Sequence, residues 1–265
     1  MYSFKYQKAK SLADAAAILS KDADARPLAG GQSLIAAMKL RLSRPSDVVD
    51  LGSIGELRGI KVEGNAITLG AMARHAEVAA SAEVKKANPA LAALAGGIGD
   101  RQVRNMGTIG GSLANNDPAA DYPAAVLGFN ATITTNKRKI AADDFFKGMY
   151  ETALAQGEII TAVTFPNPKR AAYMKFRNPA SRYAIVGVLV VDTGSGVRVA
   201  VTGAAPSVFR VTEMEKALTG KFAPESVANI KVSDADLNSD LHAKADYRAH
   251  LITVMARRAV EAALK

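Results

Sequence analysis

The sequence predicts an α+β fold in two domains, for three reasons. A chain of 265 residues is longer than a usual single domain and too short for three. Apolar residues recur at helical spacing in some segments and alternate as in strands in others. Pro166, Asn167 and Pro168 together are typical of a domain boundary. We therefore expect one domain over residues 1–168 and a second over residues 169–265.

The first domain is expected to contain two lobes, residues 1–55 and 56–168. Ser11, followed by Asp14 three residues later, indicates the N-terminus of the first helix. The first lobe is then expected to contain a helix over 12–19, a second helix ended by Pro45 and a buried strand over 48–51. The second lobe is expected to contain a hairpin turning at Glu63-Gly64-Asn65, helices over 77–94 and 119–127, and strands over 131–135 and 159–165.

The second domain shows a strand pattern followed by a helical one. Apolar strands are expected over residues 185–191 and 197–201, joined by a turn at residues 193–196. Residues 247–264 are expected to form a helix with an apolar stripe. Strands followed by helices are typical of an α+β arrangement.

The absence of cysteine excludes several kinds of chemistry at once. The chain can form no disulfide, thiolate metal site, cysteine nucleophile or iron–sulfur ligation of its own. Its histidines, His75, His242 and His250, lack the spacing of metal ligands, and no G-x-S-x-G motif supports a serine hydrolase. We therefore expect no metal site and assign no catalytic residue. His75 precedes a helical pattern, where a cap or surface role is the common one.

Charge and hydropathy restrict the partners of the chain. The formal net charge of +9 favours an acidic protein partner. The one dense basic cluster, Lys137–Lys139, falls at an expected hairpin turn without interleaved aromatic residues, so we expect no nucleic-acid binding. The longest apolar run, Ala184–Val191, is too short to cross a membrane, and residues 1–10 lack an apolar signal core. We expect a cytoplasmic protein without membrane insertion.

Two glycine pairs are candidates for phosphate binding. Gly30-Gly31 and Gly110-Gly111 each follow a short apolar segment and precede small polar residues. Glycine leaves backbone N–H groups accessible to phosphate oxygens, although a single pair is more often a tight turn. Two pairs in separate lobes suggest a diphosphate held between the lobes. Neither the P-loop motif nor G-x-G-x-x-G is present, which excludes the usual nucleotide-binding folds.

Some polar residues near these motifs have two interpretations. Asp117 is expected to open a turn and cap the helix that follows, whereas Asp121 falls inside that helix and needs another explanation. Lys175 alternates with Phe176, a pattern more typical of a solvated strand face than of a ligand clamp. Tyr183, just before an apolar strand, is equally ambiguous.

Three segments resemble one known family. They are RPLAGGQSLIAAMKLRLSRPSDVVDL from Arg26, RQVRNMGTIGGSLANNDPAADYPAA from Arg101 and AAYMKFRNPASRYAIVGVLVVD from Ala171. In order and motif they look like the FAD-binding medium subunit of molybdenum hydroxylases, the family of carbon monoxide dehydrogenase medium subunits and xanthine dehydrogenase FAD-binding subunits. The resemblance covers essentially the whole chain. It implies a two-lobed vanillyl-alcohol-oxidase-type (PCMH-type) FAD-binding domain and a C-terminal three-stranded antiparallel sheet with helices.

The resemblance also implies FAD as cofactor and assigns its binding residues. Two loops are expected to bind the pyrophosphate with backbone donors: Ala29, Gly30, Gly31, Gln32 and Ser33 in the first lobe, and Thr108, Ile109, Gly110, Gly111 and Ser112 in the second. Asp121 matches a position that hydrogen-bonds FAD, and Lys175 matches a lysine near the cofactor. Ile160 matches an apolar flavin contact, and Tyr183 an aromatic residue that covers one face of the isoalloxazine. Gln32 and Ser112 depart from the common family choices, His or Thr and Asn respectively, which affects side-chain hydrogen bonds but not backbone contacts.

The function implied is electron transfer within a complex. A large subunit with a molybdenum cofactor acts on the substrate, a small subunit carries iron–sulfur clusters, and this chain collects electrons on FAD for an external acceptor. The missing cysteines fit this division. Two alternatives remain open: a self-contained FAD oxidoreductase of the same fold, and a non-catalytic binding module whose glycine loops are only turns.

Overall fold

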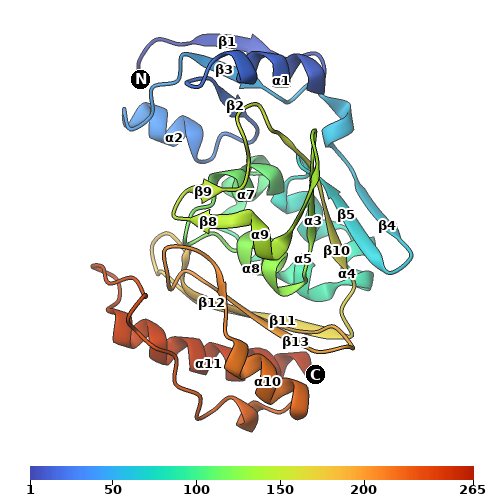
Figure 1. The fold of residues 1–265 in the computed structure, drawn as a ribbon, viewed down its shortest axis with the longest axis vertical. Coiled ribbons are helices and arrows are strands. Elements are labelled where there is room, and N and C mark those ends of the chain that lie inside the picture. The colour runs from blue at the N-terminus through green and yellow to red at the C-terminus, as the bar shows by residue number, and fades with distance from the viewer.

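The chain forms three successive units, which follow one another from top to bottom in Figure 1. The computed structural model describes all residues from Met1 to Lys265. The first unit is a parallel sheet of strand order β1-β3-β2, with α1 packed beside it. Its elements are β1 (Lys5–Lys8), α1 (Leu12–Lys21), β2 (Arg26–Leu28), α2 (Leu34–Lys39), β3 (Asp47–Asp50) and a 3-10 turn η1 (Gly55–Leu57). Ser11 caps α1 as the sequence predicts, because its hydroxyl accepts a hydrogen bond from the Asp14 N–H at 3.1 Å.

The second unit is built on an antiparallel sheet of strand order β4-β5-β10-β6-β7, which helices cover on one side (Figure 1). Its strands are β4 (Ile60–Glu63), β5 (Ala66–Gly70), β6 (Thr132–Thr135), β7 (Lys139–Ala141), β8 (Phe146–Gly148), β9 (Glu151–Thr152) and β10 (Ile160–Pro166). Its helices are α3 (His75–Ala80), α4 (Ala82–Ala87), α5 (Pro89–Gly96), α6 (Arg101–Met106), α7 (Ile109–Asn115), α8 (Tyr122–Gly128) and α9 (Ala142–Phe145). The expected hairpin at Glu63-Gly64-Asn65 is present between β4 and β5, and the basic cluster Lys137–Lys139 lies at the β6–β7 turn.

Two helices of this unit differ from the sequence prediction. The single helix expected over residues 77–94 is three short helices, because Ser81 caps α4 and Asn88 caps α5, each with its side chain. The helix expected over residues 119–127 begins only at Tyr122. Asp117 does open a turn, since its carboxylate accepts from the Ala119 N–H at 2.9 Å, but that turn precedes the helix and does not cap it.

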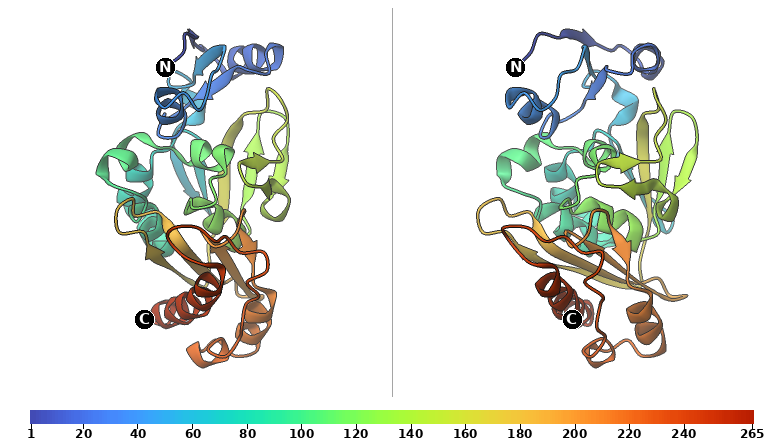
Figure 2. Two further views of the ribbon diagram at one scale, coloured as in Figure 1. Left: turned by 90° about the vertical axis from the view of Figure 1, so that its left-hand side faces the viewer. Right: turned by 60° about the vertical axis from the view of Figure 1, so that its left-hand side comes forward.

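The third unit is an antiparallel sheet of strand order β11-β12-β13-β14, with two helices on its outer face (Figures 1 and 2). Its elements are β11 (Arg170–Arg177), β12 (Ala184–Asp192), β13 (Val197–Thr202), β14 (Phe209–Arg210), α10 (Thr212–Gly220), η2 (Pro224–Ser226) and α11 (Ala245–Ala263). The expected three strands are present, and a two-residue strand, β14, adds a fourth at the edge by pairing with β13.

Strand β12 joins the third unit to the second, because both of its faces are buried. Leu189 and Val191 belong to the core of the second unit, whereas Val188 and Val190 belong to the core beneath α10 and α11. This alternation is the period of two that a pleated strand requires. A strand buried on both faces reads as the continuous apolar run that the sequence contains.

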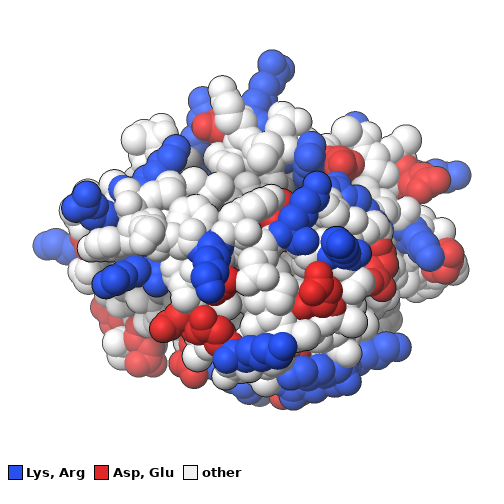
Figure 3. Space-filling model, turned by 90° about the horizontal axis from the view of Figure 1, so that it is seen from above, with Lys and Arg blue, Asp and Glu red and all other residues white.

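No helix is both long and apolar enough to cross a bilayer. On the face seen in Figure 3, basic and acidic side chains are interspersed over most of the surface.

Candidate functional site

The two glycine loops lie against each other although they come from different units. A Cβ atom placed on Gly30 would lie 2.1 Å from the Met106 carbonyl oxygen and 2.8 Å from Cα of Gly107. A Cβ atom on Gly111 would lie 3.7 Å from Cβ of Ala29. The first loop, residues 29–33, therefore packs on the segment that leads into the second loop, residues 108–112. The contact between Gly30 and Met106 is so close that only glycine fits at residue 30.

The first loop presents a run of unused backbone donors. None of the N–H groups of residues 29–34 donates a hydrogen bond to a protein acceptor. Gly31 has φ of +69°, and a left-handed residue within such a run turns successive N–H groups toward one side, as in anion-binding nests. Six free donors at one turn form a cradle that an anionic group can fill. Gln32 also contacts this loop through its own side chain, whose amide donates to the Gly30 carbonyl at 3.2 Å.

The second loop uses its donors within the protein. The N–H groups of Ile109 and Gly110 donate to the carbonyls of Ala73 and Ala71, at 3.1 and 2.8 Å. Those of the next two residues donate to Thr108, which caps α7 with its hydroxyl and its carbonyl. Four of the five N–H groups of the second loop therefore have acceptors in the protein, and Gly110 allows close packing on the chain that follows β5. That both loops bind the pyrophosphate with backbone donors stays a prediction.

Asp121, at the start of α8, and Lys175, in β11, form a buried ion pair. The Lys175 Nζ atom lies 2.9 Å from Oδ1 of Asp121 and also donates to the Gly97 carbonyl at 2.9 Å. The Tyr173 hydroxyl donates to the same carboxylate at 2.5 Å. Burial raises the pKa of Asp121, while Lys175 and Tyr173 oppose this rise because they favour the carboxylate. Lys175 is thus not on a solvated face, and the buried position of Asp121 is explained by its two partners.

The remaining predicted residues are not all accessible. Tyr183 precedes β12 and is 47% exposed, so its ring is available to a ligand. Burial and the nearby carboxylates, Asp117 among them, raise the pKa of Tyr183 and keep its hydroxyl protonated. Ile160 is buried in β10, where it pairs with Thr135. A direct flavin contact by Ile160 would need a surface that this side chain does not present.

His75 was expected to cap a helix or to lie at the surface; it is the first residue of α3 and is buried. Its ring is enclosed beside Tyr122, with ring centroids 5.3 Å apart. Burial lowers the pKa of His75 to about 4, with a further contribution from the positive charge of Arg104. His75 is therefore neutral at physiological pH. Its burial could not be read from sequence because the neighbouring residues, Arg74 and Ala76, form no distinctive pattern.

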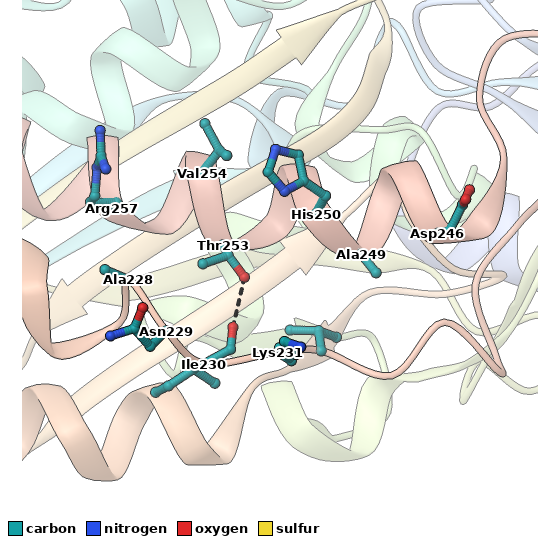
Figure 4. A pocket seen from close by; sticks show the side chains of 11 residues that line it. Ala228, Asn229, Ile230, Lys231, Asp246, Ala249, His250, Thr253, Val254 and Arg257 are labelled. Carbon is teal, nitrogen blue, oxygen red and sulfur yellow. Dashed lines mark hydrogen bonds between the residues drawn. The ribbon is translucent and has the colours of Figure 1, made fainter.

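A cavity of about 590 Å³ lies apart from the glycine loops, in the third unit (Figure 4). It lies between α11 and residues 228–232, where the Thr253 hydroxyl donates to the Ile230 carbonyl at 2.8 Å. His250 and Arg257 project from α11 along its edge (Figure 4). Its position gives it no part in the site formed by the two loops.

Comparison with known proteins decides the family. Residues 2–168 match the FAD binding domain in molybdopterin dehydrogenase, and residues 171–263 match the CO dehydrogenase flavoprotein C-terminal domain. The chain belongs to this family of FAD-binding medium subunits. Its cofactor is FAD, and it is a subunit of an oxidoreductase of the carbon monoxide and xanthine dehydrogenase type.

Relatives match this medium subunit along nearly its whole length. The carbon monoxide dehydrogenase medium chain of Afipia carboxidovorans is 38% identical, over 98% of this chain and 96% of its own. The nicotine 6-hydroxylase medium subunit of Paenarthrobacter nicotinovorans is 36% identical, over 97% of this chain and 96% of its own. The solved Cu,Mo-CO dehydrogenase matches with a TM-score of 0.91 at 37% identity, covering 99% of this chain and 98% of the other. Quinoline 2-oxidoreductase from Pseudomonas putida 86 matches with a TM-score of 0.91 at 29% identity, covering 99% and 97%.

The residues of this medium subunit fit an FAD molecule. The run of free N–H groups over residues 29–34 suits a diphosphate, which is anionic and needs several donors. The close approach of Gly30 to Met106 and Gly107 brings backbone against backbone where the two loops meet. The exposed ring of Tyr183 offers an aromatic face.

Proposed function

We propose that this medium subunit transfers electrons within a molybdenum hydroxylase complex. In this proposal it receives electrons from the iron–sulfur clusters of a small subunit and passes them to an external acceptor, while a large subunit with a molybdenum cofactor acts on the substrate. FAD, when bound, can take up electrons singly and release them in pairs. The absence of cysteine supports this division, because the chain cannot hold the clusters itself. Relatives such as the carbon monoxide dehydrogenase medium chain are, by name, one chain of a larger assembly.

The observation that carries the FAD site is the run of unused donors in the first loop. We assign the diphosphate to Ala29, Gly30, Gly31, Gln32 and Ser33, whose N–H groups have no acceptor in the protein. Thr108, Ile109, Gly110, Gly111 and Ser112 form the opposite wall, which is held in place by internal hydrogen bonds. The first loop thus binds the diphosphate, and the second loop supports the first. An anion bound only by the first loop remains sensitive to any change in the wall behind it.

The other residues act on the position of the flavin and of the elements around it. Tyr183 covers one face of the isoalloxazine, because its ring is exposed at the start of β12. Asp121 and Lys175 are enclosed, so they hold the start of α8 against β11 next to the site. Ile160 contributes to the core behind the site. We propose that residues 1–168 form the FAD-binding domain and residues 169–265 the C-terminal domain that supports Tyr183.

FAD titration of the purified chain tests the site. The visible spectrum before and after adding FAD and removing the excess gives the bound fraction, and the dissociation constant follows from a titration. Gly30→Ala should weaken binding by about tenfold or more, since its Cβ would force the two loops apart. Gly55→Ala is the matched control, because Gly55 lies in the first unit with an ordinary φ and open space around it. Equal affinity in the two variants would reject the assigned loop.

The assembled complex tests the electron-transfer role. The isolated chain should not oxidise an organic substrate, whereas the complex should do so and should lose acceptor reduction when FAD is removed. Oxidation by the isolated chain at the rate of the complex would favour a self-contained oxidoreductase. A folded chain with no affinity for FAD would favour a binding module.

A further inference from the structure

Gly107 is enclosed by His75 on one side. The N–H of His75, the first residue of α3, donates to the Gly107 carbonyl at 3.0 Å. A Cβ atom placed on residue 107 would lie 2.6 Å from Nε2 of His75 and 2.9 Å from its Cδ2. Real Cβ atoms do not approach so closely, so the imidazole occupies the space of the missing side chain.

The first glycine loop encloses Gly107 on another side. A Cβ atom on Gly30 would lie 2.8 Å from Cα of Gly107. Gly107 therefore separates the imidazole of His75 from the loop whose N–H groups are unused. Its backbone angles, φ −62° and ψ 142°, are ordinary for any residue. Space, and not backbone conformation, requires glycine at this position.

The ring of His75 has no polar contact that would account for a buried histidine. Its Nδ1 atom is fully enclosed and has no hydrogen-bond partner, and the same is true of the Tyr122 hydroxyl beside it. Burying such atoms without partners costs stability. Arg104 on α6 is the charged group that acts on the ring, and Arg74 and Glu77 are the charged residues next to His75 at the start of α3. The ring is neutral in this setting, so it acts by its shape.

We propose that His75 is a positioning residue for FAD: its imidazole ring sets the place of Gly107 against Gly30 and so fixes the spacing of the two loops. This inference rests on the proposed FAD site. A ring that is too large or absent changes the position of Gly107, and the first loop then presents its donors at the wrong place. His75 itself touches neither the flavin nor a reacting atom.

A double-mutant cycle tests the proposal. FAD dissociation constants are measured for the wild type, His75→Ala, Gly107→Ala and the combined variant. Gly107→Ala alone should weaken FAD binding by about tenfold or more, because its Cβ meets the imidazole. His75→Ala should weaken binding less, by about threefold to tenfold, through loss of the support. In the combined variant the new Cβ occupies the space left by the ring, so FAD should bind about fivefold tighter than to Gly107→Ala.

A merely structural role would give a different pattern. It would lower the unfolding temperature of both single variants but leave their effects on FAD affinity additive. Additive effects, or an unchanged affinity in His75→Ala, would overturn the inference. His75→Gln with and without Gly107→Ala serves as the second pair if the alanine variants do not fold. His250→Ala is the control for loss of a histidine, since His250 is exposed on α11.

The wild type separates this inference from the proposed function. If the wild-type chain binds no FAD, alone or in its complex, the proposed function fails. If it binds FAD and the cycle shows no coupling between residues 75 and 107, only the role of His75 fails.

Discussion

The ammonium group of Lys175 lies 2.9 Å from the carboxylate of Asp121, and each of these side chains is only 3% exposed. The pair joins β11 of the third unit to the start of α8 in the second, across 54 residues of sequence. Hydrogen bonds from Tyr173 to Asp121 and from Lys175 to the Gly97 carbonyl complete its environment. Such a pair contributes to a defined arrangement of two units more than to net stability, because desolvation offsets much of the attraction.

Breaking this pair on one side should destabilise the protein strongly. Lys175→Met leaves Asp121 buried without its counter-charge, which should lower the free energy of unfolding by about 3 to 5 kcal/mol. Urea denaturation monitored by circular dichroism measures the change. The combined Lys175→Met and Asp121→Asn variant should recover part of the loss, since no charge is then buried. Lys216→Met, on the exposed face of α10, is the control, and an equal loss there would contradict the assignment.

The sequence predicted that the two glycine pairs belong together but not that they differ. The loops do meet, with Gly30 against Met106. Local pattern gives no sign that the carbonyls of Ala71 and Ala73 occupy the donors of the second loop, because these residues lie more than thirty positions upstream. The same limit explains why the buried position of Lys175 was not predicted. Alternation places its side chain on one face of a strand but does not show that Asp121 lies opposite that face.

Secondary structure was predicted where local signals agree and missed where capping side chains interrupt a continuous helical pattern. The hairpin between β4 and β5 and the helix α1 both have their turn or cap residues in sequence, and both are present. The helical pattern over residues 77–94 is continuous in composition, so the interruptions at Ser81 and Asn88 were not recognised. His75 was misjudged because burial by α8, which is distant in sequence, decides its environment.

Removal of the Tyr183 ring should weaken FAD binding without unfolding the protein. The side chain is 47% exposed, so its loss leaves no cavity in the core. Loss of one aromatic stacking contact should lower the affinity by about twofold to tenfold. Tyr183→Phe keeps the ring and should bind FAD as the wild type does. Flavin absorbance titration measures the FAD affinity of both variants. Tyr2→Ala, at the exposed N-terminus, is the control. A deficit in Tyr183→Phe equal to that in Tyr183→Ala would show that the hydroxyl, and not the ring, makes the contact.

Glu158 should limit the stability of the protein in acid. Its side chain accepts hydrogen bonds from Arg138, from the Thr135 hydroxyl and from the Ala155 N–H. The guanidinium of Arg138 is the main cause that lowers the pKa of Glu158 from 4.5 to about 2. A depressed acid pKa contributes stability above the unfolded value and loses it as the pH falls from 4.5 toward 2. Glu158→Gln should therefore show a weaker fall in unfolding free energy over that window. Parallel curves for the two proteins would exclude Glu158 as the cause.

His75 should produce a loss of stability that begins at a higher pH than that of Glu158. Its pKa falls from 6.5 in the unfolded chain to about 4 in the folded protein, so between these values the unfolded chain binds more protons. Folding is then disfavoured increasingly as the pH falls from 6.5 to 4, by at most about 3 kcal/mol in total. His75→Gln lacks the titrating ring, so the difference in unfolding free energy between wild type and variant should shrink across this range. Urea denaturation at pH 7, 6 and 5 measures that difference, and a constant difference would show that the ring is not held neutral by burial. Most of this window lies above that of Glu158, because each window begins at the unfolded pKa of its group, 6.5 for His75 and 4.5 for Glu158.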